Sequence, residues 1–276
     1  MSKSFNFIIF HPNNAEEPQS ISSTDVLKSC DALKLKGYSV KLVWPGYGDN
    51  CNGSNPIETI FEWTPADMQL YADISNSTIM AVDWGFAGLS CYGYIQITLC
   101  LISKIADFFA HLLSNCVVVE EMELIGHSIG SQLIGYVAQH LKSRGRQVKS
   151  IFGLDPAGPG YEFGLRCQGI QTGCAKYSMV FHSNPCQLGT CDFSFGDVNV
   201  LLNPTSTYCQ PGCPCFLNPG CSHSYVLQVF RELTQKDPLF STYTAFHPAL
   251  PGLGEPAIVT IYDYMKSGYY VMNTYS

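Results

Sequence analysis

Short apolar and β-branched segments alternate with helical patterns along the first two-thirds of this 276-residue chain. Each short segment ends in a turn signal, as buried parallel strands do. The predicted strands are Phe5–Phe10, Ser39–Trp44, Thr78–Asp83, Glu121–Ile125, Ser150–Leu154 and Ser178–His182. The helical patterns cover Ser22–Leu35, Cys91–Cys116 and Ile129–Ser143. This alternation predicts an α/β fold, in which helices cover both faces of a mostly parallel sheet.

The amino-acid composition of the chain changes after Tyr161. Glycine, proline and cysteine dominate as far as Cys221, and a helix is then predicted over Ser222–Thr234. A tyrosine-rich segment, Lys266–Tyr275, reads as a last strand. Because no internal repeat or clear linker interrupts the chain, we expect a single domain over residues 1–276.

Charged residues make up 13% of the chain, about half of the usual share. The net charge of −7 disfavours a nucleic-acid partner, because no basic stripe is present to neutralise phosphates. So few charges favour association with lipid, with other chains or with itself, although a compact protein with a larger core explains them equally well. The most apolar run, Tyr94–Val119, contains Gln96, Lys104, Asp107 and His111, which argues against a membrane span.

The cysteines point to an oxidising compartment. There are 13, of which eight lie between Cys167 and Cys221, and no two form a Cys-x-x-Cys pair. This density predicts a disulfide framework and a secreted protein. The odd count leaves at least one cysteine free or bonded to another chain. The first apolar stretch is too short for a signal peptide, so no leader is recognisable in the sequence.

The segment Gly126–Gly130 reads Gly-His-Ser-Ile-Gly, directly after a predicted strand and before a predicted helix. A nucleophilic serine needs this sharp strand-to-helix turn, and the flanking glycines let the two elements approach closely. The N–H of Ile129 would then face an oxyanion. The motif alone occurs by chance in roughly one chain in ten of this length. Its context favours Ser128 as a nucleophile.

The next predicted strand ends at Asp155, which Pro156 follows. In hydrolases with such a serine turn, the acid and then the histidine follow the serine along the chain. A carboxylate at the end of the neighbouring strand could orient an imidazole. We therefore take Asp155 as the acid, against the alternative of a turn-forming Asp-Pro pair.

Three histidines follow Asp155 in the sequence. His182 lies within an apolar strand, where a structural histidine is typical, and His247 lies in a proline-rich stretch. His223 lies at a predicted helix start, held by the neighbouring Cys221. A general base needs a fixed but accessible position, which favours His223.

The same segment offers soft ligands for a metal. Four cysteines and a histidine fall within 15 residues: Cys209, Cys213, Cys215, Cys221 and His223. Zinc is the competing interpretation, but the segment has no Cys-x-x-Cys pair and lacks the spacing of a zinc knuckle.

Taken together, the chain resembles the animal neutral lipases, the group of pancreatic lipase and the insect venom phospholipases A1. The nucleophile turn and Gly153-Leu-Asp155-Pro-Ala157 are the most specific matches. Further matching segments are Val82-Asp83-Trp84, Val180-Phe-His182-Ser, Gln210-Pro-Gly-Cys213, Cys221-Ser-His223-Ser and Ser267-Gly-Tyr-Tyr270. The resemblance runs from about residue 5 to the C-terminus and implies an α/β-hydrolase fold. The chain stops before the family's C-terminal β-sandwich could begin, as the phospholipases A1 do.

The resemblance implies a serine carboxylic-ester hydrolase that cleaves the sn-1 acyl ester of phospholipids, or another lipid ester, at an interface. Ser128, Asp155 and His223 would form its catalytic triad, and no metal or organic cofactor is implied. The N–H groups of Tyr47 and Ile129 would form the oxyanion hole. In the loop before Tyr47, Pro45 replaces the family's histidine.

The resemblance also implies a disulfide between Cys213 and Cys221, which would close the lid of the site. Only seven residues separate these cysteines, so the lid is similar to the shortened lid of phospholipases A1. Phe216 and Leu217 within it would dip into a lipid interface.

A second hypothesis is a structural or storage protein that uses a lipase fold, as insect yolk proteins that have lost the serine do. The low charge, the odd cysteine and Pro45 favour this hypothesis, in which copies of the chain self-assemble through intermolecular disulfides and the triad is dormant. The presence of all three triad residues favours the enzyme.

Overall fold

The computed structural model describes most of the chain. The described residues are 6–14, 18–33, 35, 38–46, 63–83, 99–161, 169–193, 195–204, 209–214, 218–235, 244–246, 257–258, 261, 264–265 and 267–274.

The described strands form one sheet of eleven strands, in the order β10-β9-β11-β8-β7-β6-β5-β3-β4-β1-β2. The seven central strands are parallel to one another, and the pairs at both edges are antiparallel. The central strands are β3 (Ser39–Trp44), β4 (Ser77–Asp83), β5 (Glu123–His127), β6 (Ser150–Leu154), β7 (Tyr177–His182), β8 (Val198–Leu202) and β11 (Gly268–Met272). The edge strands are β1 (Asn6–Phe10), β2 (Gln19–Ser22), β9 (Thr244–Phe246) and β10 (Ala257–Ile258).

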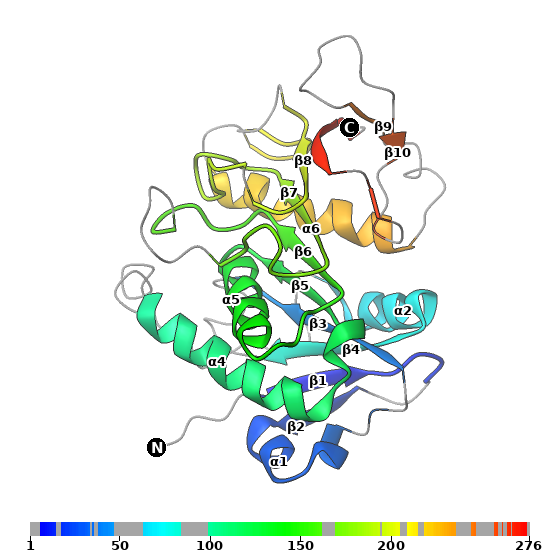
Figure 1. Ribbon diagram of the computed structural model, residues 1–276. Coiled ribbons are helices and arrows are strands. Elements are labelled where there is room, and N and C mark those ends of the chain that lie inside the picture. The colour runs from blue at the N-terminus through cyan, green and yellow to red at the C-terminus, as the bar shows by residue number, and fades with distance from the viewer. Residues whose placement is uncertain are drawn as a thin grey trace.

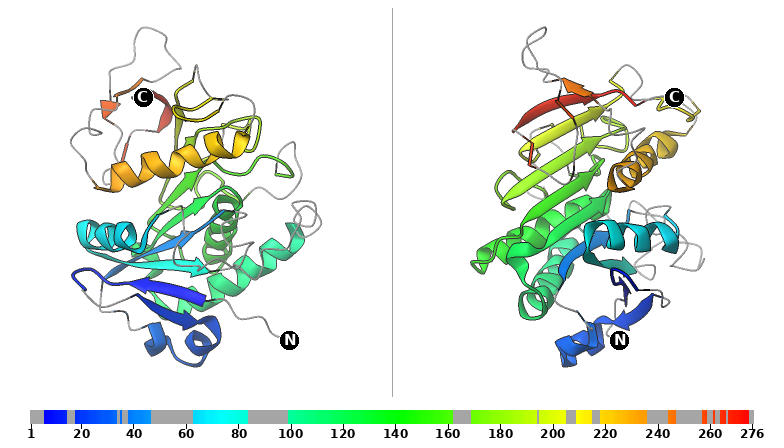
Figure 2. Two further views of the ribbon diagram at one scale, coloured as in Figure 1. Left: turned by 180° about the vertical axis from the view of Figure 1, so that it is seen from behind. Right: turned by 90° about the vertical axis from the view of Figure 1, so that its right-hand side faces the viewer.

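Helices lie on both faces of the sheet (Figure 1, Figure 2). On one face are α4 (Leu99–Cys116) and α5 (Ile129–Ser143), and on the other are α2 (Pro65–Ser75) and α6 (Pro219–Gln235). Successive strand residues point to opposite faces, so each strand feeds two cores. In β3, Leu42 belongs to the core beneath α4 and α5, and Val43 to the core beneath α2 and α6. The expected α/β fold with helices on both faces is confirmed.

Several predicted elements have other bounds in the structure. The predicted helix Ser22–Leu35 breaks at Ser29 into α1 (Ser23–Lys28) and a 3-10 helix over Cys30–Leu33, because Ser29 has an extended backbone. The strand predicted over Glu121–Ile125 begins two residues later, after a 3-10 turn at Val119–Glu121.

Helix α2 and strand β8 are among the described elements that were not predicted. Helix α2 has a capping box, in which the Thr64 side chain accepts from the Asp67 N–H at 3.2 Å and Asp67 accepts from the Thr64 N–H at 2.9 Å. Pro65 occupies the first helical position. The sequence Thr-Pro-x-Asp is therefore a helix-start signal that could have predicted α2.

Three disulfides join described cysteines: Cys30–Cys116, Cys186–Cys191 and Cys213–Cys221. Among the cysteines that the structure describes, Cys174 is a free thiol and is buried. None of the helices in the described part of the chain is both long and apolar enough to cross a bilayer.

Candidate active site

Ser128 occupies the sharp turn between β5 and α5. Its backbone has φ 55° and ψ −122°, a conformation that costs energy for a residue with a side chain. Three backbone hydrogen bonds hold it there. The Ser128 N–H donates to the Leu154 carbonyl at 3.0 Å, and the Ser128 carbonyl accepts from Ser131 and Ala157, both at 3.1 Å. The strain is thus maintained by the neighbouring strand and the helix start.

The two motif glycines are required by close backbone contacts. A Cβ at Gly130 would lie 2.3 Å from the Trp44 carbonyl oxygen, and a Cβ at Gly126 would lie 2.5 Å from the Gly130 carbonyl oxygen. Any side chain at either position would push α5 away from β3 and β5. The turn that presents Ser128 therefore depends on both glycines.

Ile129 is the first residue of α5, and no side chain caps this helix end. The first N–H groups of a helix have no acceptor within the helix, and they lie at the positive end of its dipole. The start of α5 next to Ser128 is therefore a suitable place to stabilise a negatively charged oxygen.

Asp155 follows β6 and is fully buried with a positive φ of 41°. Its Oδ1 accepts from the backbone N–H groups of Ser183 at 2.9 Å and Asn184 at 3.1 Å, and its Oδ2 lies 2.5 Å from Nδ1 of His223. Burial raises the pKa of Asp155, but the hydrogen bond and charge of His223, with the two amides, outweigh it and hold the pKa below its usual value. The carboxylate is therefore kept ionised.

His223 lies in the first turns of α6, and only 9% of its side chain is exposed. The Asp155 contact engages Nδ1, which leaves Nε2 as the nitrogen that can accept a proton. The His223 carbonyl accepts from the Ser183 hydroxyl at 3.3 Å. Ser183 thus contacts both partners of the pair.

Strand register brings these residues to one edge of the sheet. His127 pairs with Leu154 across β5 and β6, so the next residues, Ser128 and Asp155, follow adjacent parallel strands at their carboxyl ends. Within the described residues no hydrogen bond joins Ser128 to His223, which is common for such pairs before substrate binds. His127, the neighbour of Ser128, contacts His223 instead.

His182, the competing histidine, is engaged elsewhere. Its Nε2 lies 3.0 Å from Oδ1 of Asn199, and its ring lies 4.7 Å from that of Phe193. Burial lowers the pKa of His182. These contacts are those of a structural histidine. His247 lies outside the described residues.

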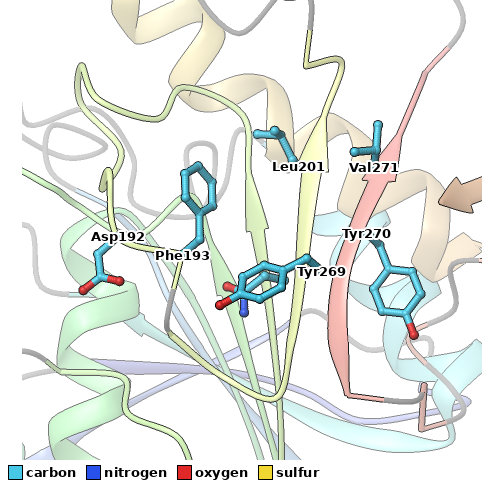
Figure 3. A pocket seen from close by; sticks show the side chains of 7 residues that line it. Asp192, Phe193, Leu201, Tyr269, Tyr270 and Val271 are labelled. Atoms are coloured by element: carbon cyan, nitrogen blue, oxygen red, sulfur yellow. The ribbon is translucent and has the colours of Figure 1, made fainter. Parts of the chain in front are cut away.

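Phe193 and Asn199 also line a pocket of about 460 Å³ on β8 and β11 (Figure 3). Phe193, Leu201, Tyr269 and Val271 make its walls largely apolar. Strands β8 and β11 are three and four places from β5 in the sheet, so neighbouring-strand spacing separates them from β5 by roughly 14–19 Å across the sheet. None of the three candidate triad residues lines it.

A second serine-histidine-aspartate group lies on the surface between α4 and α5. The Ser103 hydroxyl lies 3.2 Å from Nε2 of His140, whose Nδ1 lies 3.4 Å from Asp107. Half of the Asp107 side chain is exposed, and Arg144 contacts the same carboxylate at 2.6 Å. Ser103 lies within a helix, where backbone N–H groups are already bonded. This group therefore has similar side-chain contacts to a catalytic triad but lacks donors for an oxyanion.

The remaining predictions concern the lid disulfide, the zinc alternative and the second oxyanion donor. The structure contains the Cys213–Cys221 disulfide, whose sulfurs are 2.01 Å apart, so these two cysteines are not free to ligate zinc. No group of three or more potential metal ligands occurs in the described part of the chain. Tyr47, Phe216 and Leu217 lie outside the described residues.

Four residues that support the site were not predicted to do so. Gly46 and His127 lie against the Ser128 turn, Gly189 lies against Asp155, and Gln210 lies beneath Ser183. The Gln210 side chain donates to the Ser183 carbonyl at 2.7 Å, and its backbone N–H donates to Ser222 at 3.1 Å. The only indication in the sequence that Gln210 supports the site was its place in a segment that resembles the lipase family.

The mostly parallel sheet, the strained serine turn after β5 and the carboxylate after β6 define the α/β-hydrolase fold. The model of the Lipase family matches residues 2–224, and the chain belongs to this family. The predicted resemblance is thus confirmed.

Among its relatives, a phospholipase A1 of Vespa velutina is 32% identical over 226 residues, covering 77% of this chain and 69% of the wasp protein. Phospholipase A1 2 of Dolichovespula maculata is 29% identical over 185 residues, covering 62% of this chain. This chain spans 60% of the length of that relative. A solved esterase of Thermogutta terrifontis is 11% identical with a TM-score of 0.40, covering 67% of this chain and 69% of its own.

Proposed function

We propose that this Lipase-family protein is a serine esterase in which Ser128, Asp155 and His223 cleave a lipid acyl ester. The observation that carries this proposal is the 2.5 Å contact between Asp155 and His223, beside a serine held in a strained turn. The Asp155 carboxylate fixes the ring so that Nδ1 carries a proton and Nε2 is basic. A buried pair of this kind next to a serine turn suits nucleophilic catalysis.

In the proposed reaction, Nε2 of His223 takes the hydroxyl proton of Ser128 as Oγ attacks the ester carbonyl. The N–H groups of Ile129 and Tyr47 stabilise the resulting oxyanion, and the loss of one such donor typically lowers kcat by 10²–10³-fold. The imidazolium then gives its proton to the leaving alcohol. Water, activated by the same histidine, releases the fatty acid from the serine ester.

For the substrate we propose phospholipids, cleaved at the sn-1 ester. Two features support this choice. The two wasp relatives are named phospholipases A1. The Cys213–Cys221 disulfide closes a loop of only seven intervening residues, too short for the long lid of triglyceride lipases. We propose that Phe216 and Leu217 of this loop contact the lipid interface.

We further propose one domain over residues 1–276 and an extracellular location. The three disulfides suit an oxidising compartment, since such bonds are rare in the cytosol. The alternative of a disulfide-linked storage assembly gains nothing from Cys174, because this thiol is buried.

The first test is labelling with a fluorophosphonate, followed by intact mass measurement. We expect one label per chain, and we expect Ser128→Ala to abolish it. Ser103→Ala is the matched control, because it removes the serine of the surface group with similar side-chain contacts. Labelling lost in Ser103→Ala but kept in Ser128→Ala would reject the proposal.

The second test concerns the substrate. Vesicles of phosphatidylcholine with different chains at sn-1 and sn-2 are incubated with the protein, and the released fatty acid is identified by mass spectrometry. We expect the sn-1 chain. Equal or faster hydrolysis of triglyceride micelles would contradict the argument from the short lid.

A further inference from the structure

His127 lies between the motif glycine and Ser128, and it is 4% exposed. The reaction proposed above assigns it no step. Its imidazole is nevertheless placed where three separate segments of the site meet: the β5 end, the first turns of α6 and the loop after β3.

The first contact of His127 is with His223. The Nε2 atom of His127 lies 3.2 Å from the backbone carbonyl oxygen of His223, which can only accept, so Nε2 carries the proton. The two rings lie 4.7 Å apart at an angle of 41°. His127 thus holds both the main chain and the ring of His223 from the side of the nucleophile.

The second contact is with Gly46. A Cβ at Gly46 would lie 2.7 Å from Nδ1 of His127 and 3.1 Å from Cβ of Ser128. The loop after β3 is therefore in contact with the His127 ring and with the nucleophile. Because Tyr47 is the next residue in the chain, the ring limits how closely the start of this loop approaches Ser128.

His127 is uncharged near neutral pH. Burial, and next the charge of His223, lower the pKa of His127 to about 3, against the opposing effect of Asp155. The titratable groups that face it are His223 from α6 and Asp155 from the end of β6. A neutral ring does not oppose the positive charge that His223 gains during proton transfer.

A role in core packing alone does not account for this residue. Nδ1 of His127 is buried and has no hydrogen-bond partner among the described residues. An unsatisfied buried nitrogen lowers stability, and phenylalanine would fill the same space without it. What histidine adds is the Nε2–H donor to His223.

We propose that His127 is a positioning residue for the esterase reaction, which fixes His223 beside Ser128 through its Nε2–H. This inference rests on the proposed function. It predicts that removing the N–H donor of His127 slows attack by Ser128. Another side chain whose N–H group reaches the His223 carbonyl should restore the rate.

Two variants separate the donor from the ring. His127→Phe keeps a ring and loses the donor, and His127→Gln loses the ring and keeps an amide donor. The rate constant of fluorophosphonate labelling measures activation of Ser128 without knowledge of the natural lipid. We expect His127→Phe to label about tenfold more slowly, as expected for a lost hydrogen bond, with one label per chain at completion. His127→Gln should recover to within about threefold of the wild-type rate.

The pH profile distinguishes the loss of the donor from a change of charge near the site. One uncharged side chain replaces another in His127→Phe, so the midpoint of the labelling profile should stay in place while its plateau falls. Gly46→Ala is an independent variant that presses on the same ring, and it should also slow labelling. Circular dichroism and Tm verify that each variant is folded.

The outcomes are distinguishable. Labelled wild-type protein with an equally fast His127→Phe variant overturns this inference alone, and so does a His127→Gln variant as slow as His127→Phe. If His127→Phe does not fold, Gly46→Ala labelling at the wild-type rate overturns it. Wild-type protein that is folded but not labelled overturns the proposed function and this inference with it.

Discussion

Gly189 lies so close to Asp155 that a Cβ at this glycine would be 2.5 Å from Oδ1 and 2.8 Å from Cγ of the carboxylate. Gly189 belongs to a tight loop in which its N–H donates to the Asn184 carbonyl and its own carbonyl accepts from Cys186, both at 3.0 Å. Asn184 in turn donates to Asp155. The loop therefore presses backbone against the carboxylate and leaves it no room to rotate.

Gly189→Ala is expected to displace the Asp155 carboxylate and with it the His223 ring. Misplacement of a catalytic group by about 1 Å lowers rates by up to 10²-fold, so we expect labelling of Ser128 to slow by about 10–100-fold. Gly145→Ala is the control. Gly145 has a φ of +74° but no atom within 4 Å of an added Cβ, so that variant should lose stability and keep the labelling rate.

Asp155→Asn is expected to slow labelling by about 10³–10⁴-fold with little change of fold. The amide cannot stabilise the imidazolium, and its NH₂ group favours the wrong His223 tautomer. Asp192→Asn is the matched control, because Asp192, like Asp155, interacts electrostatically with His182 but lines the separate pocket. A similar loss in both variants would show that charge near the site, rather than the Asp155–His223 contact, is responsible.

The serine turn was predictable because its causes are local in the sequence. A strand, two glycines around Ser128 and a helix lie within one continuous stretch, and the structure has α5 at its predicted bounds. The hydrogen bonds that hold the Asp155 carboxylate were not predictable in this way. Its donors, Ser183 and Asn184, are backbone amides, which every sequence offers and which only the fold selects.

The positions where only glycine fits could not be predicted from the sequence either. Gly46 and Gly189 are ordinary loop glycines in the sequence, and their importance comes from atoms of Ser128, His127 and Asp155 that approach them in space. Strand β8 carries Asn199 among apolar residues, and Asn199 is explained only by His182 on the neighbouring strand.

A buried ion pair, at the other end of β5 from Ser128, should support the fold and not the reaction. Lys41 and Glu123 face each other across β3 and β5 in a hydrogen-bonded pair, and Lys149 adds a bond to Glu123 at 2.7 Å. Glu123→Gln leaves Lys41 buried without its partner, so we expect the free energy of unfolding to fall by about 3 kcal/mol. Urea unfolding measures this loss.

The double variant Lys41→Met with Glu123→Leu tests the cause of that loss. Removing both charges also removes the desolvation penalty, so most of the lost stability should return. The labelling rate of folded double variant should match the wild type, because Glu123 begins β5 and Ser128 follows its other end. A double variant less stable than Glu123→Gln would contradict this account.

Acid stability should depend on the pair of Glu120 and Arg146. The Arg146 guanidinium binds Glu120, with one contact at 2.8 Å, and this hydrogen bond lowers the pKa of Glu120 from 4.5 to about 2. A carboxyl whose pKa is lower in the folded state contributes stability above its unfolded pKa, and that stability is lost as the pH falls through the folded pKa. The contribution is therefore complete above about pH 4.5 and disappears towards pH 2.

Arg146→Met should flatten the fall of Tm in this range, with a loss of at most about 1 kcal/mol at pH 7, since the pair is partly exposed. Lys142→Met removes the same charge, but Lys142 donates to the Gly173 carbonyl, which does not titrate, so its Tm profile should keep the wild-type slope.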